Sequence, residues 1–171
     1  MPDIADLVLR LVGAFYVFAG IVAARAALTS RLIDVALERI SMRMGPASER
    51  HLSTWLVLSA ALVFAGGLAL LLGLDEARWL FLVSAAGQAI YLFVLAPFYF
   101  DKAEPPDARG RRQTANAFVI YVAATALVWW AAATGKLIPL AAAPPWQLAA
   151  GAGGLVAYLG FLGRHMPGGM R

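Results

Sequence analysis

Five long apolar stretches, separated by short charged segments, constrain this chain more than any other feature. They are residues 7–24, 52–74, 79–100, 114–134 and 146–162, and Arg10 is the only formal charge inside them. A bilayer core about 30 Å thick needs roughly 20 residues of helix, and stretches of about 17–25 qualify. A spanning backbone must satisfy its own hydrogen bonds, and none of these stretches alternates like a barrel strand. We therefore predict an all-α, polytopic membrane bundle of five transmembrane helices. The fifth stretch is short and glycine-rich, so four spans with a re-entrant tail remain an alternative.

Composition narrows the class of protein further. The chain has 171 residues, of which 61% are hydrophobic and 14% are charged, well below the quarter that is typical of soluble domains. The spans leave no room for a folded soluble domain, so we expect one membrane domain. The absence of cysteine excludes disulfides, thiolate metal sites and cysteine nucleophiles. The net charge of +4 fits loop arginines better than nucleic acid binding, and the excess of arginine and alanine suggests a GC-rich bacterial genome.

The basic residues of the loops predict how the chain is oriented. Eleven lie between spans one and two, between spans three and four, or in the tail, whereas only Arg10, Arg78 and Lys136 lie on the other side. Because positive residues stay in the cytoplasm, we predict a periplasmic N-terminus and a cytoplasmic C-terminus in a bacterial inner membrane. Tryptophan prefers the membrane boundary, and four of the five tryptophans fall at the ends that the charges place outside: Trp79, Trp129, Trp130 and Trp146.

Two cytoplasmic segments carry arginines suited to lipid headgroups. Residues 31–44 place their apolar side chains on one arc, and we predict an interfacial amphipathic helix that Thr29 or Ser30 caps. It serves either as a connector or as a docking surface for a partner or anionic lipid. The second segment is the turn-rich connector after span three. The candidate headgroup-binding residues are Arg39, Arg43, Arg109, Arg111 and Arg112, although topology alone also explains the last three.

A small set of polar side chains lies within the spans. Gln88 and Tyr91 are one turn apart in the third span, and Tyr121 and Thr125 are one turn apart in the fourth. An amide that faces lipid is costly, so Gln88 should point inward and bond to Thr125 or a tyrosine. The functional alternative is a pocket for a quinone, isoprenoid or lipid tail, with Tyr16 as a further polar contact.

Small residues recur at the spacing that lets helices approach closely. We predict helix-packing positions at Gly20 with Ala24 in the first span and at four sites in the fifth: Ala150, Gly153, Gly154 and Ala157. The fifth span therefore either packs within its own bundle or forms the surface that meets another subunit.

The opening Leu9-Arg10-Leu11-Val12-Gly13-Ala14-Phe15, followed by Phe18-Ala19-Gly20, resembles the first helix of DoxX-like small membrane proteins. The resemblance implies a small helical bundle associated with redox or quinone-linked membrane complexes, with Arg10, Gly13 and Gly20 as family-pattern positions. It covers about twenty residues. The chain departs from the family by its fifth span and its long amphipathic connector.

No catalytic or metal-binding motif stands out. His51 and His165 flank spans without a second ligand at metal spacing, and no carboxylate or histidine lies inside a span. We therefore expect a non-catalytic subunit or assembly factor of a bacterial inner-membrane complex, with lipids and other membrane subunits or a second copy as partners. The alternative is a small carrier or binding protein for a lipid, quinone or neutral solute. A membrane enzyme is less favoured, and no cofactor is expected beyond a quinone or lipid.

Overall fold

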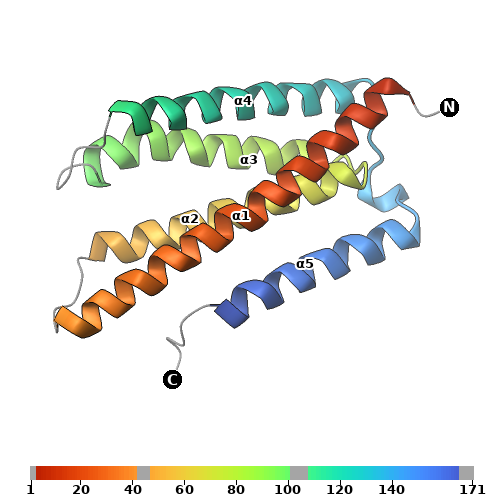
Figure 1. The fold of residues 1–171 in the computed structure, drawn as a ribbon. Helices are drawn as coiled ribbons and strands as arrows, with labels where there is room; N and C mark the ends of the chain where they lie inside the picture. The colour runs from red at the N-terminus through yellow and green to blue at the C-terminus, as the bar shows by residue number, and fades with distance from the viewer. Residues whose placement is uncertain (1–2, 42–46, 101–107, 166–171) are drawn as a thin grey trace.

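The chain forms a bundle of five long helices in a computed structural model that describes residues 3–41, 47–100 and 108–165 (Figure 1). The helices are α1 (Ile4–Ser41), α2 (Ala47–Leu71), α3 (Ala77–Ile90), α4 (Ala108–Ala133) and α5 (Pro145–His165). A π-helical segment, η1 (Tyr91–Phe100), continues α3, and a single 3-10 turn, η2 (Leu140–Ala142), lies between α4 and α5. No strand occurs in these described ranges, and the predicted all-α class is confirmed there.

All five helices, with η1 counted as part of α3, are long and apolar enough to cross a membrane. Large apolar side chains also cover much of the outside of the bundle. Phe15, Phe18, Val119, Val156 and Leu159 are each more than half exposed. Such a surface is unfavourable in water but suits a hydrocarbon solvent. The fold is therefore compatible with a multi-pass membrane protein.

The first helix is longer than the sequence predicted. α1 runs unbroken for 38 residues, so the expected connector at residues 25–30 is helical. The amphipathic segment continues this helix through Ser41 and is not a separate element; residues 42–44 lie outside the described ranges. No glycine or proline interrupts the chain after Gly20 until Gly45. Thr29 does not cap a new helix, because its hydroxyl donates to the Arg25 carbonyl at 2.9 Å, a bond typical of a helix interior.

Glycines set the contact between α1 and α2. A Cβ at Gly13 would lie 2.5 Å from a backbone nitrogen of α2, and one at Gly67 would lie 2.6 Å from a backbone nitrogen of α1. A Cβ at Gly20, further along α1, would lie 2.8 Å from backbone atoms of α2. Ala24, one turn later, is fully buried. The two backbones can therefore approach this closely only because these positions carry no side chain or a very small one.

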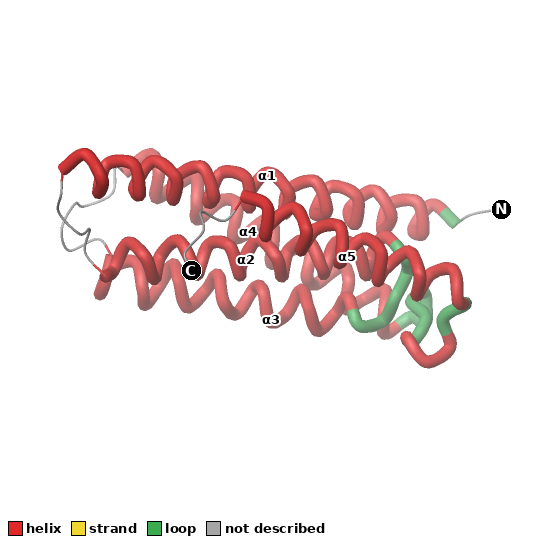
Figure 2. The backbone as a smooth tube through the Cα atoms, turned by 90° about the horizontal axis from the view of Figure 1, so that it is seen from below, coloured by secondary structure: helices red, strands yellow, loops and turns green. Residues whose placement is uncertain are grey.

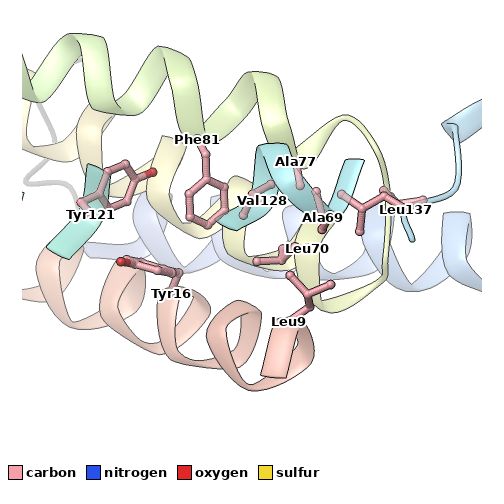
Figure 3. Packing of buried hydrophobic residues seen from close by; sticks show 11 residues of the cluster. Leu9, Tyr16, Ala69, Leu70, Ala77, Phe81, Tyr121, Val128 and Leu137 are labelled. Carbon is pink, nitrogen blue, oxygen red and sulfur yellow. The ribbon is translucent and has the colours of Figure 1, made fainter. Parts of the chain in front are cut away.

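Two apolar clusters hold the bundle together. The first joins α1, α2, α3 and α4 through Leu9, Tyr16, Leu70, Phe81, Tyr121 and Val128, among others (Figure 3). The second lies further along the bundle and joins α1, α2 and α5 through Leu28, Val57, Phe64, Tyr158 and Leu162, among others. Both clusters therefore include residues of α1 and α2, and α5 packs mainly against this pair.

The third span changes its geometry halfway along. α3 ends at Ile90, and the chain continues as a π-helix that contains Pro97. Proline lacks a backbone N–H and clashes with the carbonyl four residues earlier. Local π geometry lets the freed backbone groups find other partners. The departure from α geometry begins six residues before Pro97, at Tyr91.

The connections α2–α3 and α4–α5 are bonded together at the end of the bundle where α1 begins (Figure 2). The Ile138 N–H donates to the Gly73 carbonyl at 2.8 Å, and the Asp75 N–H donates to the Ile138 carbonyl at 2.9 Å. The Leu140 N–H donates to the Glu76 carboxylate at 2.9 Å. Gly73 adopts a left-handed φ of 73°, which suits a glycine that ends a helix. This end is therefore held by backbone hydrogen bonds as well as by side chains.

Candidate functional site

A lateral groove lies between α3 and α5, with α2 as its floor. Figure 1 shows α3 and α5 on opposite sides of α2. The groove has a volume of about 550 Å³, which falls within the range of roughly 300–1,000 Å³ that is usual for small-molecule sites. Its lining includes Trp55, Ser59 and Leu62 from α2, Ser84 and Gly87 from α3, and Tyr158 from α5.

Helical spacing brings these side chains to one surface. Trp55, Ser59 and Leu62 follow each other at four and three residues, so they share one face of α2. Ser84 and Gly87 are three residues apart on α3. A Cβ at Gly87 would lie 3.8 Å from the Trp55 ring, an ordinary van der Waals distance. The glycine therefore leaves open a space that a larger side chain would occupy.

The groove is elongated. Its lining extends along α2 from Trp55 to Ala65, a rise of about 15 Å at 1.5 Å per residue. An elongated recess with mostly carbon walls suits a hydrocarbon chain.

The polar groups on the groove walls are few, and two have partners within the protein. Ser84 Oγ accepts a hydrogen bond from Gln88 Nε2 at 3.2 Å. The Tyr158 hydroxyl donates to the Gly20 carbonyl at 3.3 Å, and its ring stacks on Phe64 with centroids 4.0 Å apart. The remaining lining is mostly aliphatic and aromatic carbon. Such walls bind apolar surface well and offer little to a charged solute.

Three aromatic rings meet next to the groove, inside the bundle (Figure 3). Tyr16 contacts Phe81 and Tyr121 edge-on, with centroids 5.2 and 5.1 Å apart. Phe81 stacks on Tyr121 at 5.4 Å. The Tyr121 hydroxyl is buried and lies near Ser84 of α3. Thr125 donates its hydroxyl to the Tyr121 carbonyl at 2.9 Å, on its own helix.

The structure brings together only part of the predicted polar set. Tyr16, Tyr121 and Thr125 are buried, whereas Gln88 and Tyr91 are half-buried. The expected bond between Gln88 and Thr125 is replaced by bonds that each side chain makes on its own helix. None of the five residues lines the α2–α3–α5 groove.

Sequence reasoning missed the residues that do line this groove. Trp55, Ser59 and Tyr158 are common membrane residues, and nothing in their local sequence shows that α2 and α5 bring them together. Only the position of Ser84 could have been noticed in the sequence, because Ser84 lies one turn before Gln88 on the same face of the helix. That spacing fits a bond within α3 as well as it fits one between helices.

A second, shallower groove separates α1 from α4. It has a volume of about 480 Å³, and its lining includes Leu11, Phe15 and Tyr16 from α1 and Ile120 and Ala124 from α4. It is more open than the first groove, and its walls are almost entirely carbon. Of these two apolar recesses, the one between α3 and α5 is the better enclosed.

The small residues of α5 face two ways. Gly154 is half-buried, and a Cβ there would lie 2.9 Å from the Leu68 side chain of α2. Ala150, Gly153 and Ala157 are exposed. Although Ala150 and Ala157 lie within one turn of Gly154, no helix of this bundle covers these three residues in the described ranges. Of the two roles expected for them, contact with another subunit stays a prediction.

The candidate headgroup arginines are only partly described. Arg43 lies outside the described ranges, and the side chains of Arg39, Arg109 and Arg111 lie outside them too. Arg112 is exposed at the start of the apolar part of α4. Among the described residues, no three His, Cys, Asp or Glu side chains gather as metal ligands would.

Charged side chains gather at the end of the bundle where α1 begins. Lys136 donates a hydrogen bond to the Asp3 carboxylate. This bond lowers the pKa of Asp3 and raises the pKa of Lys136, and the attraction between the two charges adds to both shifts. Arg78 pairs with Asp75 at 2.9 Å. Its guanidinium lies 5.3 Å from the ring centre of Trp79, which also contacts Trp129. Trp79 and Trp129 were both predicted to lie at the outer boundary of the membrane.

In comparisons with known proteins, no family model, no curated protein and no solved structure matches the chain. The resemblance of the first helix to DoxX-like proteins therefore stays a prediction.

Proposed function

We propose that the protein is a non-catalytic membrane protein that holds the apolar tail of a lipid or quinone in the α2–α3–α5 groove. The observation that carries this proposal is the shape and lining of the groove, about 550 Å³ of mostly carbon-lined space that extends along α2. In a bilayer, this groove faces sideways between two spans. A chain can therefore enter from the membrane without leaving hydrocarbon.

The polar groups of the groove fit a binding role better than a catalytic one. Ser84 and the Tyr158 hydroxyl already have partners within the protein. Neither lies in hydrogen-bond contact with a base among the described residues, which a serine nucleophile would require. They can orient the first polar atoms of a quinone or lipid that lies beside them.

A Gly87→Leu variant tests the proposal. The leucine side chain would extend into the groove beside Trp55, where a Cβ has room. We expect the purified variant to lose the lipid or quinone that co-purifies with the wild type in mild detergent. Quantitative mass spectrometry of organic extracts measures this, per mole of protein. Unchanged content in Gly87→Leu would contradict the proposal.

Two further variants control this experiment. Gly160→Leu makes the same change on the exposed side of α5, where no atom lies within 4 Å of a Cβ, and should retain the bound molecule. Gln88→Leu should retain it as well, because Gln88 does not line the groove. Thermal unfolding of all three variants shows whether a loss of ligand merely reflects a loss of fold.

The second candidate is an accessory subunit or assembly factor of an inner-membrane complex. The observation in its favour is the exposed face of α5, where Ala150, Gly153, Ala157 and Gly160 follow at helical spacing. Such a face lets a partner helix approach closely where lipid provides no hydrophobic drive. A stoichiometric partner that co-purifies with the wild type and is lost in Gly153→Leu supports this role.

A further inference from the structure

A further and chemically different pocket lies at the end of the bundle where α1 begins. It has a volume of about 190 Å³ and is lined by Asp6 and Arg10 of α1, Gly73 after α2, Lys136 after α4, and Gln147 of α5, together with neighbouring leucines. No residue lines both this pocket and the α2–α3–α5 groove. About six waters would fill it, at roughly 30 Å³ each.

The walls of this pocket are held in place by the backbone. Ile138, which lines it, exchanges hydrogen bonds with the turn after α2, at 2.8 and 2.9 Å. Lys136, on the same connection, is tied to Asp3 at the start of α1. Three segments that are distant in the sequence are thereby joined around one space. A site built this way needs little reordering to bind a ligand.

Arg10 provides an uncommitted cation at this pocket. Its guanidinium has five N–H donors, and one of them reaches the Leu71 carbonyl at a long 3.5 Å. No ion pair joins Arg10 to a carboxylate within the described residues, including Asp6 four residues earlier. Arginine matches the oxygens of phosphate with a planar fork of donors.

Gln147 provides an unsatisfied amide. Its side chain is 6% exposed, and its Oε1 has no hydrogen-bond partner within the described residues. Buried amides are nearly always bonded, to protein, water or ligand. The amide belongs to the wall of the pocket. A polar ligand there would therefore provide a partner that the described residues do not.

Asp6 gives the pocket a negative side. This carboxylate is half-buried and lines the same space as Arg10. Lys136 is held mainly by Asp3, and Asp6 contributes a smaller attraction to it. The pocket thus presents a guanidinium and a carboxylate, one helical turn apart on α1. Its best ligand carries both charges, and the apolar side chains nearby suit the glycerol end of a lipid.

We infer that this pocket binds the headgroup of a zwitterionic phospholipid with a primary amine, with the phosphate at Arg10 and the ammonium at Asp6. Gln147, on the wall of the same pocket, offers its amide as a hydrogen-bond partner for the headgroup. This inference does not depend on the proposed tail-binding groove.

Lipid binding to the delipidated full chain tests the inference. Phosphatidylethanolamine and phosphatidylcholine with identical short tails are titrated and observed by native mass spectrometry. They share the phosphate, but only the ethanolamine headgroup has N–H donors. We expect phosphatidylethanolamine to bind roughly 10-fold or more tightly, as loss of a charge-assisted hydrogen bond predicts. Equal affinity for the two lipids would overturn the inference.

Matched variants assign the effect to the pocket. Arg10→Gln should weaken phosphatidylethanolamine binding roughly 10- to 100-fold. Arg25→Gln removes an exposed arginine further along the same helix and should leave binding unchanged. Asp6→Asn should remove the preference over phosphatidylcholine. Unchanged binding in Arg10→Gln, or equal losses in Arg10→Gln and Arg25→Gln, would overturn the assignment. If Arg10→Gln fails to fold, the inference is tested by the preference of the wild type for phosphatidylethanolamine and by the loss of that preference in Asp6→Asn.

Two further measurements separate a headgroup site from its alternatives. Soluble glycerophosphoethanolamine should compete with the short-tailed lipid, whereas inorganic phosphate should compete much more weakly. If inorganic phosphate competes as strongly as glycerophosphoethanolamine, the pocket is a simple anion site. That result would overturn the inference that the pocket binds the amine. Gln147→Leu should lose the lipid preference while the ligand-free protein unfolds at the same or a higher temperature, because its unpartnered amide is gone.

Discussion

Space at single residues determines how closely α1 and α2 approach. Gly13 and Gly67 face each other across this contact, and a Cβ at either would meet the opposite backbone at 2.5–2.6 Å. Backbone atoms cannot move aside as the end of a flexible side chain can. These glycines are therefore required by packing and not by an unusual φ, in contrast to Gly73 and Gly135.

Replacing Gly67 with alanine should separate α1 from α2. We expect a loss of about 1–3 kcal/mol in the free energy of unfolding, because overpacking forces the backbones apart. Denaturation followed by circular dichroism in a fixed detergent measures this. Gly153→Ala, in open space on α5, is the matched control. It should be neutral or up to about 1 kcal/mol more stable, from helix propensity alone. Equal stability of Gly67→Ala and wild type would contradict this account.

Sequence spacing identified part of this contact. The pair Gly20 and Ala24 follows the small-residue spacing, and both residues lie between α1 and α2. Gly13 and Gly67 were not paired in advance, because the match between two helices depends on how far one slides along the other. The same limit applies to Ala150, Gly153 and Ala157. Their spacing is suitable, but the rotation of α5 turns them outward.

Among the elements, α5 is held by the fewest contacts. It rests on α2 and α1 through the stack of Tyr158 on Phe64, the Tyr158 hydroxyl bond to Gly20, and the close approach of Gly154 to Leu68. By contrast, α1 and α2 share buried residues along most of their length. Elements with few buried contacts open first in local unfolding.

Tyr158→Leu should loosen α5 selectively. Loss of an aromatic pair removes about 0.5–1.5 kcal/mol, which corresponds to amide hydrogen exchange in α5 that is roughly 2- to 10-fold faster. Tyr158→Phe keeps the ring and loses only the hydroxyl bond, so its effect should be about 0.6 kcal/mol or less. Exchange mass spectrometry resolves the helices. A uniform increase over all five would show that α5 is not a separate unit.

The groove beside α5 could not be predicted at this scale. Its residues come from positions 55–65, 83–87 and 155–159. Each of these segments alone has the apolar composition of any transmembrane helix. Periodicity predicts which segments are helices, but it does not predict which faces adjoin. The continuity of α1 was missed for a different reason: Thr29 or Ser30 was predicted to cap a separate helix, although neither residue breaks a helix.

At the scale of the whole molecule, two ends are distinct. The start of α1, the α2–α3 turn and the α4–α5 connection share one end (Figures 1 and 2). The end of α1 and the start of α4 share the other. The number of long apolar helices followed from the sequence, because each span needs an apolar stretch of roughly 20 residues, whereas the full length of α1 did not. The orientation of these ends in a membrane stays a prediction from the loop arginines.

Cysteine labelling tests this orientation directly, since the chain has no cysteine of its own. Gly110→Cys, near the start of α4, and Ala142→Cys, before α5, both introduce an exposed thiol. In intact spheroplasts a membrane-impermeant maleimide should label Ala142→Cys at once and Gly110→Cys only after permeabilisation. The reverse pattern would place the N-terminus in the cytoplasm. Labelling of both thiols in intact cells would refute the predicted topology.

The uninterrupted length of α1 has a mechanical consequence. At 1.5 Å per residue its 38 residues extend for about 57 Å, nearly twice the hydrocarbon thickness of about 30 Å. In a bilayer, a single stiff rod would thus connect the headgroup-sized pocket at one surface to the region beyond the other. A tilt imposed on its first turns would swing the far tip sideways, with no hinge to absorb the motion.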